Sequence, residues 1–351
     1  MFSKRQFNKG YVIRLAYPLL LTKTANLSKS ATAMKRFIKI SLTIIIVVLA
    51  TLILAGNYLL DYALQPDPNR TDTDSAYAEL YEQYPDMESW VNNLKANNCL
   101  LDTFITVPTG LQQHAIYIKG SSEQNRTAII VHGYKDCSIK FLYLAKMYNE
   151  HLGYNVLMPD LHAHGLSEGG EIQMGWKDAD DLLTWCETAY NIFSKEDTPT
   201  SIIVHGISMG AATTMNLSGK KIPSYIKGFI EDCGYTSVWE QFKNELQAQF
   251  GLPSFPLLNI ASELCNIRYG WRFQEASPLY SVRNSKLPML FIHGNADTFV
   301  QTEMVNKLYN AKDNNKQLWI VPEAKHAKSY KTHPQEYTEK VSIFCNKIFN
   351  K

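Results

Sequence analysis

Ser208 lies at the centre of a Gly-x-Ser-x-Gly motif that extends from Gly206 to Gly210. An apolar, β-rich run, Ser201–His205, precedes the motif, and a helical run, Met209–Ser218, follows it. A sharp strand-to-helix turn exposes a serine hydroxyl, and glycines flank the serine because side chains there would collide with neighbouring backbone. The bare motif also occurs by chance, but its position between a strand and a helix favours a nucleophilic serine.

A serine hydroxyl is a weak nucleophile at neutral pH, so it needs a base, and the base needs an orienting acid. In a strand-turn-helix site of this kind, the acid and then the histidine follow the serine along the chain. His326 falls in a loop directly after the β-rich run Gln317–Val321 and is the predicted base. His333, which precedes Pro334, is the alternative base, whereas His293 ends a strand and is expected to shape the turn there.

The predicted acid is Asp297, which follows the β-rich run Pro288–Ile292. Asp297 would lie beside the loop of His326 if the strand before Asp297 and the strand before His326 are neighbours in the sheet. Asp232 is the alternative acid, because it ends the strand Ile226–Glu231, beside the nucleophile strand. A turn or helix-capping role is the favoured interpretation of Asp232.

The negative oxygen of a tetrahedral intermediate must be met by backbone N–H groups. Met209 directly follows the serine, so its N–H is the first predicted donor to this oxyanion hole. The second donor is expected in the loop after the run Thr127–Val131. That loop begins His132-Gly133-Tyr134, which makes the Tyr134 N–H the natural candidate.

The elements that must position these residues alternate between short β-rich runs and helical runs, which predicts an α/β sheet with right-handed crossovers. Several strands are continuous apolar stretches, as expected at the centre of a parallel sheet covered on both faces. The predicted strands are residues 103–108, 113–118, 127–131, 155–159, 201–205, 226–231, 288–292 and 317–321. The predicted helices are residues 76–98, interrupted at Pro85, and residues 139–152, 175–193, 209–218, 301–311 and 334–350.

Residues 236–277 interrupt this alternation with a long helical, aromatic-rich segment between two strands. Ligands bind at the strand ends of such sheets, so an insertion at this point is expected to form a small cap. The cap would supply the apolar wall of a substrate pocket. The alternative interpretation is a single long packing helix.

From about residue 100 to 350 the chain resembles bacterial α/β-hydrolases of the serine-aminopeptidase-like and esterase groups. The matching motifs are His132-Gly133-Tyr134, Asp160 to Ser167, Gly206 to Gly210, Glu231 to Gly234, Ala276 to Leu279, the Asp297 turn and His326. The resemblance implies the α/β-hydrolase fold, with a mostly parallel eight-stranded sheet and the site residues named above. In the family's usual Asp-x-Arg-Gly-His-Gly-x-Ser, His162 replaces arginine and Ala163 replaces glycine, which affects the local loop structure rather than the triad.

No cofactor or metal is predicted. The six cysteines are scattered without a Cys-x-x-Cys pair, which argues against a zinc or redox site. His162 and His164, beside Asp160, form an alternative zinc pair, but the same residues match the structural turn of the family. The structural interpretation is therefore favoured.

Residues 41–60 contain no charged residue and are as long as the roughly 20 residues that a helix needs to cross a bilayer. The run is longer than the ~7–15-residue apolar core of a cleaved signal peptide, so an uncleaved anchor is favoured. A buried core helix is the weaker alternative, because such helices rarely lack a polar face. Met34 is a second candidate start of the protein.

Charge gives the expected orientation. Residues 1–60 hold nine of the 35 basic residues and none of the 33 acidic ones, so the rest of the chain is acidic. Positive flanks stay in the cytoplasm, which predicts a single-pass protein with a cytoplasmic N-terminus and an extracytoplasmic domain. An acidic body also argues against nucleic acid as a partner, because polyphosphates need clustered Lys and Arg.

The expected organisation is a basic cytoplasmic segment (1–40), a transmembrane helix (41–60), a linker (61–75) and an α/β-hydrolase domain (76–351). The expected activity is hydrolysis of an ester, or of a thioester or amide, through an acyl-enzyme on Ser208. The expected partners are a small-molecule acyl substrate and the membrane. Two alternatives remain, an exopeptidase of the serine-aminopeptidase type and a catalytically silent hydrolase fold that serves as a binding module.

Overall fold

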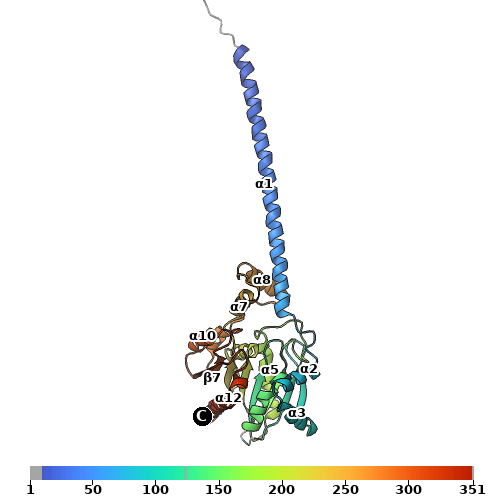
Figure 1. Ribbon diagram of the computed structural model, residues 1–351, viewed down its shortest axis with the longest axis vertical. Helices are drawn as coiled ribbons and strands as arrows, with labels where there is room; N and C mark the ends of the chain where they lie inside the picture. Colours follow the sequence, from blue (N-terminus) through green and yellow to red (C-terminus); the bar gives the residue numbers. More distant parts are fainter. Residues whose placement is uncertain (1–9, 122, 124, 350–351) are drawn as a thin grey trace, which may run out of the picture. The chain divides into compact units, whose positions relative to one another are not determined.

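The computed structural model describes residues 10–121, 123 and 125–349, with side chains from residue 29 onward (Figure 1). The chain divides into two compact units between Gly56 and Asn57. The described residues of the first unit, 10–56, lie in one long apolar helix, α1 (Gly10–Leu64). Within that helix, Lys29–Leu64 is long and apolar enough to cross a membrane. The last eight residues of α1 belong to the second unit.

The second unit is built on one eight-stranded sheet with the order β1-β2-β4-β3-β5-β6-β7-β8. β1 and β2 pair antiparallel, as do β2 and β4, and all other neighbours pair parallel. This topology confirms the predicted fold. The strands are β1 (Leu101–Thr106), β2 (Gln112–Ile118), β3 (Arg126–Val131), β4 (Asn155–Pro159), β5 (Ser201–Ile207), β6 (Ile226–Asp232), β7 (Met289–Gly294) and β8 (Lys316–Val321).

Alternate residues of the central strands enter two different hydrophobic clusters, because successive side chains of a strand point to opposite faces of the sheet. In β3, Ile129 and Val131 belong to one cluster, and Ala128 and Ile130 belong to the other. Helices α5 (Asp178–Phe193), α6 (Met209–Ser218) and α10 (Glu303–Ala311) contribute to the first cluster. Helices α2 (Thr73–Gln83), α3 (Met87–Ala96), α4 (Leu142–Lys146) and α12 (Pro334–Phe349) contribute to the second.

Two short helical turns, Ser138–Phe141 and Met147–His151, flank α4 and complete the helical run predicted for residues 139–152. Pro85 separates α2 from α3, as the sequence predicts, because proline lacks the N–H that a continuing helix needs. A four-residue helix, α11 (Ser329–Thr332), precedes α12. All six cysteines lie in the described part of the chain and all are free thiols.

The segment predicted as a cap contains two helices, α7 (Val238–Phe250) and α8 (Leu257–Tyr269), rather than one long helix. The Ser237 hydroxyl accepts a hydrogen bond from the Glu240 N–H (3.1 Å) and caps the start of α7. Gly251, at a φ of 66°, ends α7 in the left-handed conformation that glycine adopts readily. The chain then returns through α9 (Pro278–Asn284) to β7.

The end of α1 is part of the core of the second unit. Leu60 and Leu64 are fully buried in the first hydrophobic cluster, and the Leu64 carbonyl accepts a hydrogen bond from the Ile172 N–H (2.7 Å). Arg268 of α8 donates to Asp61 (2.6 Å) and to Asn57 (3.0 Å). The helix therefore continues through residues 61–64 of the expected linker, because these side chains have a docking site on the domain.

Replacing Leu64 by alanine is expected to destabilise the folded domain by about 2–5 kcal/mol, because it removes a buried side chain and leaves a cavity. The measurement is denaturant unfolding of the full chain in detergent, with Leu252→Ala as the control. Leu252 is 41% exposed, so its loss should cost far less. Equal stability of the two variants would show that the end of α1 does not contribute to the fold.

Candidate active site

Ser208 lies in the turn between β5 and α6, with φ 57° and ψ −116°. This strained backbone conformation is expected of a serine held at the top of a strand. A Cβ atom added to Gly206 would lie 2.0 Å from the Gly210 carbonyl oxygen, and one added to Gly210 would lie 2.1 Å from the Val131 carbonyl oxygen. Both flanking glycines are therefore required by close backbone contacts.

The structure brings Ser208, His326 and Asp297 together from three separate loops. Ser208 Oγ lies 2.8 Å from His326 Nε2, and His326 Nδ1 lies 2.7 Å from Asp297 Oδ2. His326 follows β8 and Asp297 follows β7, and these two strands are neighbours. With the Nδ1 proton directed at the carboxylate, Nε2 is free to accept the serine proton.

Asp297 is held as a carboxylate. Its Oδ1 atom accepts hydrogen bonds from the backbone N–H groups of Phe299 and Val300, both at 3.0 Å. Although burial alone would raise the pKa of Asp297, hydrogen bonds from His293 and His326 lower it to about 2. A group with this pKa stays ionised wherever a histidine base is neutral, as an orienting acid must.

Asp232, the alternative acid, belongs to a different hydrogen-bond network. It accepts hydrogen bonds from the hydroxyls of Ser329 (2.9 Å) and Tyr337 (3.0 Å), and Tyr337 also contacts His205 Nε2 (2.9 Å). Burial raises the pKa of Asp232 to about 6. Its backbone carbonyl accepts the Ser208 N–H (2.8 Å), so Asp232 supports the turn while its carboxylate points into the second cluster of the core.

The other two histidine candidates do not contact Ser208. His333 caps the end of α11, and its backbone carbonyl accepts the Tyr337 N–H (2.9 Å). His293 is completely buried and contacts the Val300 carbonyl (2.8 Å), which fits a role in shaping the turn. Its Nε2 atom also lies 3.3 Å from Asp297 Oδ2, a contact that sequence alone did not indicate.

Met209 and Tyr134, whose N–H groups are the expected oxyanion donors, both lie close to Ser208. Met209 begins α6, so its N–H has no partner within the helix. Gly133, directly before Tyr134, would place an added Cβ 3.5 Å from the Ser208 Cβ, which puts the loop after β3 beside the serine. Among the described residues no hydrogen bond occupies the N–H of Met209 or Tyr134. The Tyr134 hydroxyl donates to the Ala63 carbonyl of α1 (2.8 Å).

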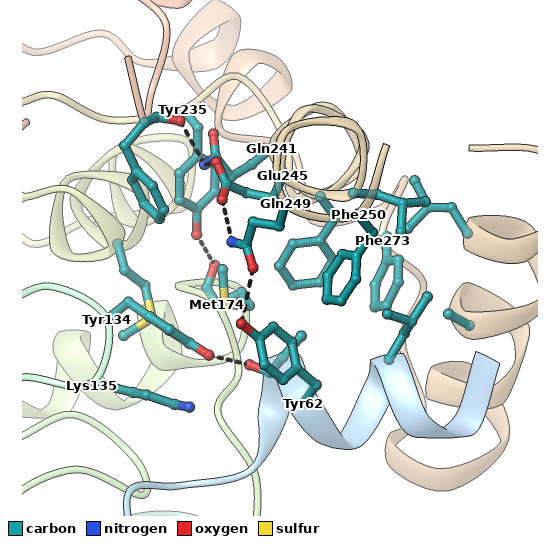
Figure 2. A pocket seen from close by; sticks show the side chains of 18 of the residues that line it. Tyr62, Tyr134, Lys135, Met174, Tyr235, Gln241, Glu245, Gln249, Phe250 and Phe273 are labelled. Carbon is teal, nitrogen blue, oxygen red and sulfur yellow. Dashed lines mark hydrogen bonds between the residues drawn. The ribbon is translucent and has the colours of Figure 1, made fainter. Parts of the chain in front are cut away.

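A cavity of about 230 Å³ opens beside Ser208. Figure 2 shows part of its lining, with Tyr134, Met174 and Phe273 among the labelled side chains. Its walls come from the cap, from the loop after β3 and from the last turns of α1. The apolar lining includes Leu59, Ala63, Met174, Phe242, Leu246, Leu258, Ala261, Phe273 and Phe299. The cap therefore lines the pocket, and the end of α1 lines it too, which was not expected from the sequence.

A row of polar side chains on α7 crosses one wall of this cavity (Figure 2). The Gln249 amide donates to Glu245 (2.6 Å) and accepts from the Tyr62 hydroxyl (2.9 Å). The Gln241 amide donates to the Phe299 carbonyl (3.0 Å), and its buried oxygen has no partner within the described part of the chain. Sequence analysis missed these residues, although their spacing of four places them on one face of a helix.

The Asp160 to Ser167 loop contains the alternative zinc pair. His164 Nε2 accepts the Lys135 N–H (3.1 Å), and its Nδ1 atom contacts the His162 carbonyl (2.8 Å). His164 is therefore engaged with backbone. Within the described chain, Cys233, Asp297 and His326 form a cluster of residues of metal-ligating types, and this cluster includes the predicted acid and the predicted base.

Asp160 organises this loop through a buried ion pair. Asp160 Oδ2 lies 2.7 Å from His114 Nδ1, and His114 Nε2 lies 2.9 Å from Asp102 Oδ1. Burial alone would lower the pKa of His114, but its hydrogen bonds with Asp102 and Asp160 raise it to about 9. A pKa raised on folding stabilises the protein below the unfolded-state pKa, and this contribution is lost as the pH rises through about 9.

The free energy of unfolding is therefore expected to fall between pH 6.5 and 9.5 more steeply in the wild type than in His114→Gln. Over this pH range the wild type should lose on the order of 1–3 kcal/mol more unfolding free energy than His114→Gln. The effect is limited because solvent near the exposed Asp102 screens part of its interaction with His114. Urea unfolding of both full-length proteins in detergent at several pH values measures it. Parallel pH profiles would mean that His114 is not charged in the folded state.

Comparison with known proteins gives matches over this domain. The family described as serine aminopeptidase, S33, matches residues 122–266. The uncharacterized protein YqkD of Bacillus subtilis is 32% identical over 222 residues, which cover 63% of this chain and 72% of YqkD. The family match includes the nucleophile turn and most of the cap.

Solved structures share the fold at lower identity. An esterase of Pyrococcus furiosus superimposes with a TM-score of 0.57 at 24% identity, over 71% of this chain and 93% of that one. A puromycin-hydrolyzing peptidase of Mycobacterium tuberculosis superimposes with a TM-score of 0.55 at 16% identity, over 71% of this chain and 39% of that one. The same fold thus occurs in an esterase and in a peptidase, so the residues of the site must distinguish the two activities.

Proposed function

The chain belongs to the serine aminopeptidase S33 family of the α/β-hydrolase superfamily, and from this membership we propose that it is a membrane-anchored serine hydrolase that cleaves carboxylic esters. The observation that carries the proposal is the hydrogen-bonded series Ser208, His326 and Asp297 at the mouth of an apolar cavity. The same series would also cleave thioesters or amides.

In the proposed mechanism, Ser208 Oγ attacks the carbonyl carbon while His326 Nε2 takes its proton. The N–H groups of Met209 and Tyr134 stabilise the oxyanion, and such a donor contributes roughly 100- to 1,000-fold to kcat. His326 then protonates the leaving alcohol. Water, activated by the same histidine, releases the acyl group from Ser208. Asp297 holds the imidazole in the tautomer that these steps need.

Esters are favoured over peptides because most of the cavity wall is apolar. An acyl chain gains free energy by leaving water for such a wall, whereas a peptide would lose backbone hydrogen bonds there.

Glu245 supports exopeptidase activity as the second candidate. Its carboxylate lines the cavity and accepts from Gln249, and among the described residues no Lys or Arg forms an ion pair with it. An N-terminal ammonium of a peptide would be a suitable partner.

A panel of p-nitrophenyl esters and aminoacyl p-nitroanilides distinguishes the two activities. We expect ester turnover to exceed anilide turnover for the full chain in detergent. Faster anilide turnover, lost in Glu245→Gln but not in the neighbouring Lys243→Gln, would favour the exopeptidase. A catalytically silent binding module would turn over neither class and would not react with a fluorophosphonate.

The proposed anchor is α1, with the basic N-terminus in the cytoplasm and the hydrolase domain outside. The apolar run 41–60 of α1 and the basic residues that precede this run support this orientation. Protease added to spheroplasts that express the full chain should digest the domain. Full protection would contradict the exported orientation, and recovery of a soluble chain that begins after residue 55 would indicate a cleaved signal sequence.

A further inference from the structure

The last turns of α1 contribute directly to the cavity that contains Ser208. Leu59, Tyr62 and Ala63 line that cavity together with the cap. The Tyr62 ring packs edge-on against Phe250 of α7, with the ring centroids 5.8 Å apart. A helix that served only as a tether would need none of these contacts, so the position of the helix end bears on how substrate reaches the serine.

Large apolar side chains are exposed on the cap elements that contact this helix end. Together with two tyrosines of α1, these side chains form a surface that we call the cap edge. It consists of Tyr58, Tyr62, Phe250, Leu252, Phe255 and Ile267. Phe255 is 74% exposed and Ile267 is 77% exposed. Ile267 precedes Arg268, which binds Asp61, and Phe255 lies in the short loop that follows Phe250. Gathered exposed apolar side chains mark an interaction site.

The connection to the proposed membrane span identifies what covers the cap edge. The span expected from the sequence, residues 41–60, ends at Leu60, and a helix rises about 1.5 Å per residue, so Tyr62 would lie about 3 Å along the axis beyond that end. Tyrosine is enriched at the boundary between bilayer and water, where its ring and hydroxyl meet both phases. With the span ending there, Tyr58 and Tyr62, whose rings stack at 6.4 Å, would lie at that boundary, and the Phe250 ring contacts Tyr62.

We propose that the cap edge docks in the bilayer interface, and that the site draws its substrate, an acyl ester of a single-chain amphiphile, directly from the membrane. This proposal rests on the hydrolase function proposed above. The cavity of about 230 Å³ is smaller than the roughly 300–1,000 Å³ of pockets for drug-sized ligands, so it admits a segment of one acyl chain. The remainder of the chain stays in lipid.

The reaction on such a substrate is the ordinary two-step hydrolysis. Ser208 forms an ester with the acyl group, the bond between the carbonyl carbon and the alcohol oxygen breaks, and the alcohol leaves with the proton from His326. Water then cleaves the acyl-enzyme, which releases the fatty acid and restores the serine hydroxyl. No redox partner or further reactant is needed.

The test uses the full chain in phosphatidylcholine vesicles and two substrates with one leaving group, 4-methylumbelliferyl palmitate in the bilayer and 4-methylumbelliferyl butyrate in water. The variant Phe255→Ser/Ile267→Asn changes two cap-edge residues outside the cavity. Tyr280→Ser/Ile343→Asn is the matched control, since these residues are 67% and 56% exposed and lie on α9 and α12. We expect palmitate turnover to fall roughly tenfold or more only in the cap-edge variant. Each of its two apolar side chains contributes to membrane affinity through the area that it buries in lipid.

Butyrate turnover should be unchanged in both variants. If butyrate is hydrolysed but the cap-edge variant matches the control on palmitate, the membrane inference is wrong and the hydrolase function stands. If wild type hydrolyses neither ester and does not react with a fluorophosphonate, the hydrolase function itself fails.

Docking is also measured without turnover. In vesicles that contain brominated phosphatidylcholine, the tryptophan added by Phe255→Trp should be quenched relative to the unmodified chain, and the tryptophan added by Tyr280→Trp should not. Equal quenching of the two added tryptophans would overturn the docking of the cap edge, whatever the activity results are.

Discussion

Replacing Ser208 by alanine is expected to lower kcat for ester hydrolysis by on the order of 10⁴- to 10⁶-fold with little change in KM, because the nucleophile is lost while the cavity is retained. The folded structure should persist, since alanine removes only the hydroxyl. Steady-state kinetics of the purified full chain on p-nitrophenyl butyrate measures the effect, and thermal unfolding verifies the fold.

Ser218→Ala is the matched control, because Ser218 lies at the far end of the same helix and its hydroxyl donates to the Met215 carbonyl (2.7 Å). Its kcat should remain within about twofold of wild type, which is within the usual range for a change away from the site. A Ser208→Ala protein with kcat within tenfold of wild type would mean that another group carries the chemistry.

Replacing Asp297 by asparagine is expected to lower kcat by about 10⁴-fold, as does the loss of an orienting carboxylate in a triad of this type. Asparagine can present its amide to His326 Nδ1, which favours the tautomer with the proton on Nε2. That tautomer cannot accept the serine proton. The same variant should show little change in KM, because the side chain of Asp297 does not line the cavity.

Asp232→Asn separates the two candidate acids. Its kcat should fall by less than about tenfold, because this carboxylate is bonded to Ser329 and Tyr337 rather than to His326. Its stability should fall instead, since a buried network loses one charged acceptor. A larger kcat loss in Asp232→Asn than in Asp297→Asn would reverse the assignment of the acid.

Most of the fold could be predicted because its signals are local. Several of the eight strands are apolar runs bounded by turns, and the structure has all eight with ends shifted by at most two residues. The last turn of α1 was less accessible to prediction. Asp61, Pro66 and Asp67 give residues 61–75 the composition of a linker, which conceals the buried pair Leu60 and Leu64.

The candidate site was partly accessible from sequence. Ser208, Asp297 and His326 each follow a strand, and adjacent parallel strands bring their carboxyl ends to one edge of the sheet. Chain order alone could not rank Asp232 against Asp297, because both residues follow strands near Ser208. Their hydrogen-bond partners distinguish them, and these come from loops and helices far along the chain.

The walls of the cavity could not be predicted from the sequence, because they depend on tertiary contacts. The aromatic residues of residues 236–277 indicated a cap, but their helical spacing did not reveal which of them face the serine. The row formed by Gln241, Glu245 and Gln249 meets Tyr62 only because the end of α1 docks against α7. No local pattern in either segment specifies that contact.

Every step proposed above depends on Ser208 as the nucleophile. Peptide mapping by mass spectrometry, after the full chain reacts with a fluorophosphonate, tests this role. We expect one adduct, on the peptide that contains Ser208, and none on Ser208→Ala. An adduct on a different serine in the wild type, or undiminished labelling of Ser208→Ala, would contradict it.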